Sequence, residues 1–446
     1  MKKYLLLLAV GAIALGAAMY VSYSMGFNTT IRTNPVQFKQ DTAVQDAIQL
    51  VNQGKAIFRY DTFGDQAFWG DTLLLHQAIE GEQLGGVGSG VSPETALAVG
   101  LKVDVNALPR SLREQIRLGN VDLTDPATTV ALLKLNAVVG VKGFFDRSGN
   151  MTSMGITCAL CHSTVDDSFV PGIGNRLDGW PNRDLNVGAI IGLAPNLTPI
   201  ENRLSVDEAT VKTVLNSWGP GKFDAELLHD GIPFRPDGGS AATLIPPAFG
   251  MAGINLHTYV GWGSVPYWNA FVAVTEMQGQ GRFYDPRLND PAKFPLDAKF
   301  GTWNITATPD LVTSKLAPLH MYQLSLLAPK PPPGSYNVRA AALGDKLFDG
   351  KAGCATCHTP PLYSEPGFSM HNGTEIGIDN FQADRSPDDM YRTTSLRGML
   401  AHSQGGFFHD GRFATLLDVV NHYNTFFNLG LTEPEKMQLV EYLKSL

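Results

Sequence analysis

All four cysteines of this chain lie in two copies of one short pattern, Cys-x-x-Cys-His. The copies are CALCH at residues 158–162 and CATCH at residues 354–358, far apart in the sequence. This spacing is typical of covalent haem attachment, in which two sulfurs form thioethers with the porphyrin and the adjacent histidine binds the iron. The pattern therefore predicts two haem c groups, held by Cys158, Cys161, His162, Cys354, Cys357 and His358, with His162 and His358 as the iron ligands.

Three other uses of the cysteines compete with haem attachment. Disulfides are the ordinary use of cysteine in an exported protein. A four-cysteine zinc site places its two pairs about 15–20 residues apart, whereas these pairs are widely separated. A thioredoxin-like redox motif uses a single Cys-x-x-Cys and does not explain a histidine after each pair. Haem attachment accounts for every cysteine and for both histidines, so we favour it.

The first 26 residues predict export. Lys2 and Lys3 precede an uncharged apolar run from Tyr4 to about Val21, the arrangement of a secretory signal. At roughly 1.5 Å per residue the run nearly crosses a ~30 Å hydrocarbon core, so a cleaved signal peptide and an uncleaved inner-membrane anchor both remain open. In either case we expect the mature chain in the periplasm, because c-type haem is attached outside the cytoplasm.

The bulk composition is that of a globular protein, with 44% hydrophobic and 17% charged residues. A net charge of −8 at pH 7, without a basic stripe, excludes nucleic acid as a partner. The 446 residues suffice for two or three domains. We expect a signal peptide or anchor (1–26), an N-terminal extension (27–125), a first haem domain (126–327), a proline-rich linker (328–337) and a second haem domain (338–446).

Helices are expected on both sides of the second Cys-x-x-Cys-His. One should cover residues 338–348, where Leu343 and Leu347 share a helical face. Another should begin at Thr432, because Thr-Glu-Pro-Glu is a capping box with proline in the first turn. A helix before the cysteines and a helix at the chain end, packed together beside the haem, build a small cytochrome c domain.

The first haem region contains similar parts. Helices are expected over residues 130–139 and over residues 209–218, the second capped by residues 205–208. Residues 247–252 resemble residues 394–399, and both lead to an aromatic, glycine-containing turn and an apolar helix. The predicted fold class is therefore mainly α, with two cytochrome c-like haem domains that arose by repetition, long loops and an N-terminal extension.

The C-terminal third resembles a known family. YRTTSLRG (391–398), FFHDGRFATLLDVVNHYN (407–424) and LTEPEKMQLVEYLKSL (431–446) are similar to the C-terminal haem domain of bacterial dihaem cytochrome c peroxidases and their MauG-like relatives. The resemblance covers about residues 338–446, with weaker similarity over 244–290. It implies that the second haem is six-coordinate and relays electrons, while the first meets peroxide or oxygen at an open iron.

The resemblance also implies roles for residues of the second domain. The family places an axial methionine or tyrosine on the helix after the HDGR-type turn, where this chain has Tyr423. Tyrosine ligation would favour ferric iron and lower the reduction potential. Arg392 and Arg397 are expected to pair with haem propionates. Rival ligands to Tyr423 are His409, His422 and Met399.

The first domain departs from the family pattern. The peroxidases carry a bridging tryptophan, a glutamine ten residues later and a catalytic glutamate twenty residues later. Counting from Trp268 gives Gln278, but Leu288 stands where glutamate is expected. Alignment through the internal repeat instead selects Trp262, with Glu276 on the following helix. Both alignments remain open, and Glu276 is the candidate carboxylate for moving a proton in peroxide cleavage.

Three functions are compatible with these residues. The chain could carry electrons with both haems six-coordinate, reduce hydrogen peroxide at the first haem as a cytochrome c peroxidase-like oxidoreductase, or act as a MauG-like oxygenase or maturation enzyme. Met277 could close the first iron as a sixth ligand. Expected partners are a periplasmic electron donor or acceptor, such as a small cytochrome c, a cupredoxin or a quinone-linked enzyme, and hydrogen peroxide. Structural roles are expected for His229, His257 and His320.

Overall fold

The computed structural model describes residues 41–446, so the predicted signal or anchor at residues 1–26 lies outside the described residues. Contacts divide the chain into two units, residues 1–49 and residues 50–446. Within the described part, none of the helices combines the length and apolar character needed to cross a membrane. Residues 50–446 form one compact unit, which carries both Cys-x-x-Cys-His patterns.

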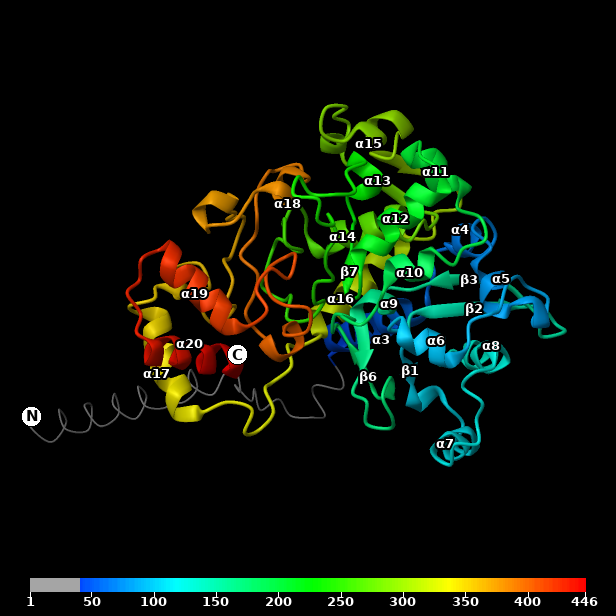
Figure 1. Ribbon diagram of the computed structural model, residues 1–446, viewed down its shortest axis with the longest axis horizontal. Helices are drawn as coiled ribbons and strands as arrows, with labels where there is room; N and C mark the ends of the chain where they lie inside the picture. The colour runs from blue at the N-terminus through cyan, green and yellow to red at the C-terminus, as the bar shows by residue number, and fades with distance from the viewer. Residues whose placement is uncertain (1–40) are drawn as a thin grey trace, which may run out of the picture. The chain divides into compact units, whose positions relative to one another are not determined.

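Helices are the main elements of the described chain, and long loops join them (Figure 1). This predominance of helices agrees with the predicted mainly α fold, although most of the helices are short. The α-helices are α3 (Thr42–Tyr60), α4 (Gln66–Trp69), α5 (Leu75–Glu80), α6 (Pro93–Ala98), α7 (Arg110–Arg117), α8 (Pro126–Lys134), α9 (Ala159–His162), α10 (Val187–Ile191), α11 (Thr198–Leu204), α12 (Glu208–Trp218), α13 (Leu227–Asp230), α14 (Val265–Phe271), α15 (Pro295–Phe300), α16 (Leu316–Ser325), α17 (Val338–Asp349), α18 (Phe381–Asp384), α19 (Leu416–Phe426) and α20 (Glu433–Ser445).

The strands in residues 41–446 are short and form five two-stranded sheets. One pair, β1 with β5, is parallel, and the other four pairs are antiparallel. All ten strands precede α17. They are β1 (Val103–Asp104), β2 (Val141–Phe145), β3 (Met151–Ile156), β4 (Ser163–Val165), β5 (Ile173–Gly174), β6 (Arg176–Asp178), β7 (Lys222–Phe223), β8 (Thr243–Leu244), β9 (Arg282–Tyr284) and β10 (Asn304–Thr306), paired as β1–β5, β2–β3, β4–β6, β7–β8 and β9–β10.

The predicted boundaries of the helix before the first Cys-x-x-Cys-His are wrong. The sequence predicts residues 130–139, whereas α8 covers Pro126–Lys134. Asn136 adopts a left-handed backbone with φ of 50°, which a continuing helix does not allow. Val138 then forms a β-bridge with Val103. The apolar run thus continues past the helix because its last residues enter the core as extended chain.

The helix predicted over residues 209–218 is confirmed as α12. Its cap lies within residues 205–208, as expected. The carboxylate of Asp207 accepts the backbone N–H of Thr210 at 2.9 Å, while Ser205 has a left-handed backbone and ends the preceding helix α11. Asp207 is therefore the N-cap, a role for which aspartate is well suited.

The helices predicted around the second Cys-x-x-Cys-His are both confirmed. They are α17 and α20, which pack against each other (Figure 1). Thr432 and Glu435 form the predicted capping box at the start of α20. The two helices approach so closely at Gly344 that an added Cβ would lie 2.1 Å from the carbonyl oxygen of Gln438. Only glycine fits this contact without a shift of the backbone.

The two turns matched by the internal similarity have the same backbone geometry. Residues 257 and 263 form one β-bridge, and residues 407 and 413 form another with the same spacing. Gly261 and Gly411 occupy corresponding positions and have φ of 60° and 78°. Each turn leads into a helix, α14 or α19. The expected similarity of the two turns is therefore confirmed.

A buried ion cluster ties the chain after α18 to the segment around α13. Arg385 Nε donates to Asp230 at 2.6 Å, and its Nη2 lies 2.9 Å from an oxygen of Asp224. The three side chains are at most 2% exposed. Glu226 adds a third buried carboxylate beside the same guanidinium. One arginine thus faces three acids in the interior.

Candidate haem-binding sites

A backbone carbonyl orients each histidine of the two Cys-x-x-Cys-His patterns. His162 ends the short helix α9, and its Nδ1 donates to the carbonyl of Pro246 at 3.0 Å. His358 Nδ1 donates to the carbonyl of Tyr363 at 3.1 Å. A ring that donates from Nδ1 keeps its lone pair on Nε2, the tautomer required of an iron ligand. Burial lowers the pKa of His162 to about 4 and also lowers that of His358, so both rings are neutral at pH 7.

The four thiols lie in surroundings that raise their pKa values. All are partly buried, and none of the four is in a disulfide. Burial raises the pKa of Cys158 and Cys161 to about 12 and that of Cys354 to about 11. Reactive dithiols have lowered thiol pKa values. These properties disfavour the redox and disulfide alternatives.

A cavity of about 1070 Å³, including its open mouth, lies against the first Cys-x-x-Cys-His. Three parts of the chain form its wall. They contribute Cys158 and His162 from the first pattern, Trp268, Ala273 and Met277 from α14 and the residues after it, and Arg392, Arg397 and His402 from the C-terminal third.

Two cationic side chains at this cavity lack an acidic partner. Arg392 donates from Nε to the carbonyl of Thr258 at 2.9 Å and from Nη1 to that of Thr393 at 3.1 Å. Arg397 donates to the carbonyl of Gly250. Neither guanidinium forms an ion pair with any carboxylate in residues 41–446, although burial lowers the pKa of Arg392 to about 10. Buried cations need an anion, and haem propionates are anions of suitable chemistry, so the cavity fits a haem.

The two candidate bridging tryptophans lie at one place. Trp262 and Trp268 stack with ring centroids 5.1 Å apart and an interplanar angle of 8°. Trp262 is 4% exposed and packs on Phe271 and Phe294, while Trp268 lines the cavity. Both indole Nε1 atoms are buried and have no hydrogen-bond partner within the described chain. The two sequence alignments therefore lead to the same aromatic pair.

Glu276 belongs to a buried network that sequence reasoning missed. It ends the π-helical turn η3 (Val272–Glu276), a feature that often marks functional sites. His229 Nε2 lies 3.3 Å from Glu276, and His229 Nδ1 lies 2.6 Å from Asp297. Arg203 donates to Asp297 at 3.1 Å. The partners are far apart in sequence, so no local pattern signals the network.

Protonation in this network is set by opposing effects. Burial alone would lower the pKa of His229, but its two carboxylate partners raise it to about 10, so the ring is cationic at pH 7. Burial raises the pKa of Glu276, and His229 opposes that rise. The charge of Glu276 also raises the pKa of Cys161, so the Glu276 carboxylate lies near the first Cys-x-x-Cys-His. Its side chain is not among those that line the cavity, where Met277 lies instead.

Gln278 and Met277 are held by backbone contacts. Gln278 has a left-handed backbone with φ of 62°, and its side-chain amide donates to the carbonyl of Thr275. The indole of Trp69 donates to the carbonyl of Met277 at 2.9 Å. Gln278 is not among the cavity-lining residues, so only Met277 of these two neighbours faces the first site.

Tyr423 is the predicted ligand that lies near the second pattern. Burial raises its pKa, and the thiols of Cys354 and Cys357 add to the rise because they are close by. Its rival His422 donates from Nε2 to the carbonyl of Ile376 at 2.8 Å. His409 is 3% exposed and stacks on Tyr391, and Met399 is buried. Proximity to the thiols thus favours Tyr423 among the candidates.

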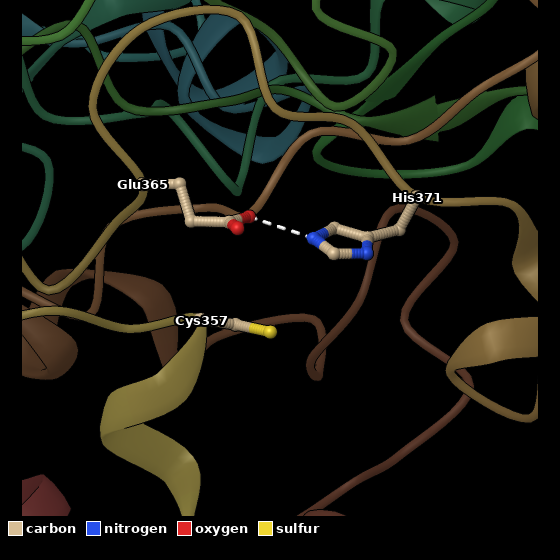
Figure 2. A group of neighbouring side chains, drawn as sticks. All are labelled: Cys357, Glu365 and His371. Carbon is tan, nitrogen blue, oxygen red and sulfur yellow. Dashed lines mark hydrogen bonds and ion pairs between the residues drawn. The ribbon is translucent and has the colours of Figure 1, made fainter.

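Two polar side chains, Glu365 and His371, lie beside Cys357 (Figure 2). Glu365 and His371 are joined by a hydrogen bond of 2.7 Å, and ligand atoms of all three side chains lie within 4.8 Å of one another. Such a set could hold a metal ion only while Cys357 keeps a free thiolate. Haem attachment would convert that sulfur to a thioether, so the haem and ion alternatives exclude each other.

Comparison with known proteins yields two informative relatives. No family model matches the chain. The methylamine utilization protein MauG of Methylorubrum extorquens is 31% identical over 123 residues, 24% of this chain and 34% of the relative. The cytochrome-c peroxidase IdrP1 of Denitromonas iodatirespirans is 30% identical over 151 residues, 24% of this chain and 40% of the relative. The matches thus span about a third to two fifths of the length of these curated relatives.

Two solved structures share weaker likeness. A hydrazine synthase of Kuenenia stuttgartiensis, pressurized with xenon, has 21% sequence identity and a TM-score of 0.28. A MauG-like protein associated with microbial copper homeostasis has 18% identity and a TM-score of 0.32. Each match covers 48% of this chain and 76% of the other. At such TM-scores neither likeness bears on the fold.

Proposed function

We propose that this chain, which its sequence relatives place in the superfamily of MauG and dihaem cytochrome c peroxidases, carries two covalent haems and passes electrons between them. The supporting observation is the repeated geometry of the two patterns. In each, two half-buried thiols adjoin a neutral histidine whose Nδ1 donates to a backbone carbonyl. Haem supplies one-electron chemistry when bound, and the chain supplies attachment, orientation and charge balance.

The haem stoichiometry tests this proposal. Intact-mass spectrometry of the purified periplasmic protein should show two haem additions, and the double variant Cys158→Ala/Cys161→Ala should retain one. The matched variant Cys354→Ala/Cys357→Ala should also retain one, at the other site. A chain that carries disulfides or a single haem would refute the proposal.

We place the working protein in the periplasm, with a soluble or quinone-linked electron partner. The supporting observations are the export-like first residues and the chemistry of the Cys-x-x-Cys-His patterns.

A stacked tryptophan pair beside the first site offers a route for electrons, because indoles are readily oxidised side chains close to the cavity. Stopped-flow oxidation of the reduced protein by small cytochromes c and cupredoxins would identify the partner class.

Peroxide reduction at the first site is the second candidate function. The peroxidase relative IdrP1 supports it, and Glu276, which pairs with the cationic His229, directly precedes the cavity residue Met277. A carboxylate that shuttles a proton contributes about 10²–10⁴-fold. Glu276→Gln should therefore slow peroxide consumption by this factor, with both haems still attached. An unchanged rate, or no consumption by the wild-type protein, would remove this candidate and leave the electron-carrier and MauG-like alternatives.

A further inference from the structure

A second cavity lies in a part of the chain that the family resemblance does not cover. Helices α6, α7 and α8 and the extended chain near them form its wall, and α7 lies at the edge of the molecule (Figure 1). The cavity measures about 950 Å³, including its open mouth. Its described lining contains no cysteine and none of the candidate haem ligands. Haem attachment therefore does not explain this cavity.

The wall of the second cavity is aliphatic apart from Lys102, Thr128 and Thr129. The Nζ of Lys102 lies 2.5 Å from a carboxylate oxygen of Asp184. The hydroxyl of Thr128 donates to the carbonyl of Asp122 at 2.8 Å, and the hydroxyl of Thr129 is fully buried. A ligand in this cavity thus meets mainly hydrocarbon, so its buried part must be apolar, because a polar group would lose its hydrogen bonds to water.

The apolar wall continues to the surface through the chain that follows α7. Leu118 is 61% exposed and Leu123 is 39% exposed. Leu123 and Val121 also line the cavity. Exposed apolar surface beside a cavity is typical of a binding site. The mouth is therefore suited to admit a hydrocarbon chain from solvent.

Helix α7 adds positive charge beside this wall. Leu112 and Ile116 are four residues apart, so they share the face of α7 that lines the cavity. Arg113 and Arg117 follow them directly, and Arg110 lies one turn before Arg113. None of these three arginines forms an ion pair with a carboxylate in residues 41–446. Arg113 is half-buried, and its Nε has no hydrogen-bond partner among the described residues.

The acids on and after α7 leave these arginines unneutralised. Glu114 is exposed and forms no ion pair within the described part of the chain. The carboxylate of Asp122 accepts the backbone N–H and the hydroxyl of Thr124 at 2.8 and 2.7 Å. The carboxylate of Asp125 caps α8. A half-buried cation without a partner, such as Arg113, is stabilised by an added anion.

We infer that the second cavity binds a long-chain fatty acid, whose hydrocarbon chain lies along the aliphatic wall and whose carboxylate pairs with Arg113. A carboxylate suits this position because a guanidinium group binds it with two parallel hydrogen bonds. The inference does not depend on the proposed haems. It gives the N-terminal extension a ligand of its own, in addition to the electron transfer proposed for the haem domains.

Titration of the haem-loaded protein with palmitate tests the inference, after co-purified lipid has been removed on a hydrophobic resin. Calorimetry should show saturable binding of one palmitate. Octanoate has a shorter chain and cetyl alcohol has no charge, so each should bind at least about tenfold more weakly. These comparisons need no variant, and they separate the contribution of the chain from that of the carboxylate.

Matched variants locate the site. Ala131 is exposed and lines the cavity, so Ala131→Trp should fill the mouth without displacing the core and should abolish palmitate binding. Arg113→Gln should weaken palmitate binding about tenfold and leave cetyl alcohol binding unchanged. Two controls lie outside the cavity lining, namely Ala209→Trp on the exposed side of α12 and Arg147→Gln in the β2–β3 turn. Both should bind palmitate like the wild type.

Several results would overturn the inference. They are the absence of saturable palmitate binding to the wild-type protein, wild-type affinity in Ala131→Trp, and equal weakening of palmitate and cetyl alcohol in Arg113→Gln. Binding to vesicles of anionic phospholipid without binding of free palmitate would also overturn it, since that result indicates a membrane-contact surface. Far-ultraviolet circular dichroism establishes that each variant is folded before its affinity is compared.

Discussion

Arg385 is the cation of a buried ion cluster, and its replacement by methionine should lower the free energy of unfolding. Its guanidinium faces Asp224, Asp230 and Glu226, each at most 6% exposed. Arg385→Met keeps much of the side-chain volume but leaves the acids without a cation. Removal of one partner from a buried pair costs about 3–5 kcal/mol. We expect a loss of this size in the free energy of unfolding at pH 8.

The loss should depend on pH in a defined direction. Burial raises the pKa of Asp224 to about 8 even with Arg385 present, whereas an unfolded aspartate titrates near 3.9. The folded protein therefore binds a proton that the unfolded chain releases, and this group's contribution to stability falls as pH rises from about 4 to about 8. Without Arg385 the folded pKa rises further. Arg385→Met should thus lose more stability at pH 8 than at pH 5.5, where the acids can be neutral.

Unfolding of the holoprotein in guanidinium chloride measures the loss of stability at each pH. It is followed by far-ultraviolet circular dichroism and by haem absorbance. Coincident transitions at each pH would justify comparison of the midpoints. The matched control is Arg282→Met, because Arg282 is 64% exposed and lies 3.9 Å from Asp310, so its loss should cost at most about 1 kcal/mol. An Arg385→Met protein within about 0.5 kcal/mol of wild type at pH 8, or equally destabilised at both pH values, would refute the reasoning.

Three further predictions concern single residues. Burial raises the pKa of Asp65 to about 9, so Asp65→Asn should gain stability relative to wild type as pH rises from about 5 to about 9, by at most ~1.4 kcal/mol per pH unit; parallel pH profiles would contradict this. Tyr423→Phe should raise the reduction potential of the second haem and remove its tyrosinate charge-transfer absorption, and an unchanged visible spectrum would exclude ligation. Gly344→Ala places a Cβ against the carbonyl of Gln438 and should lower the unfolding free energy by about 1–3 kcal/mol, so a neutral result by denaturant titration would mean that α17 and α20 pack less closely than described.

Local signals in the sequence predicted local structure well. The capping box at Thr432 needs only four residues, and α20 begins there. Hydrophobic periodicity placed the end of α8 wrongly. Val138 is buried as part of an extended segment, which forms a β-bridge with Val103, and not as part of a helix. Periodicity records burial, and extended chain and helix can bury the same residue.

Long-range pairs in the candidate sites were beyond a single sequence. His229 meets Asp297 and Glu276 only after the chain folds, and each of these residues taken alone resembles an ordinary surface acid or loop histidine. The uncertainty between Trp262 and Trp268 had a different origin, since the two rings stack and either alignment marks one site.

The shared wall of the first cavity constrains the order in which the protein can be made. Cys158 and His162 are synthesised long before Arg392 and His402, which line the same cavity. The C-terminal third forms part of the cavity wall, so the wall is complete only after that part of the chain has folded against the first pattern. A truncation before residue 392 would therefore remove one wall of the first cavity while leaving both Cys-x-x-Cys-His patterns in the chain.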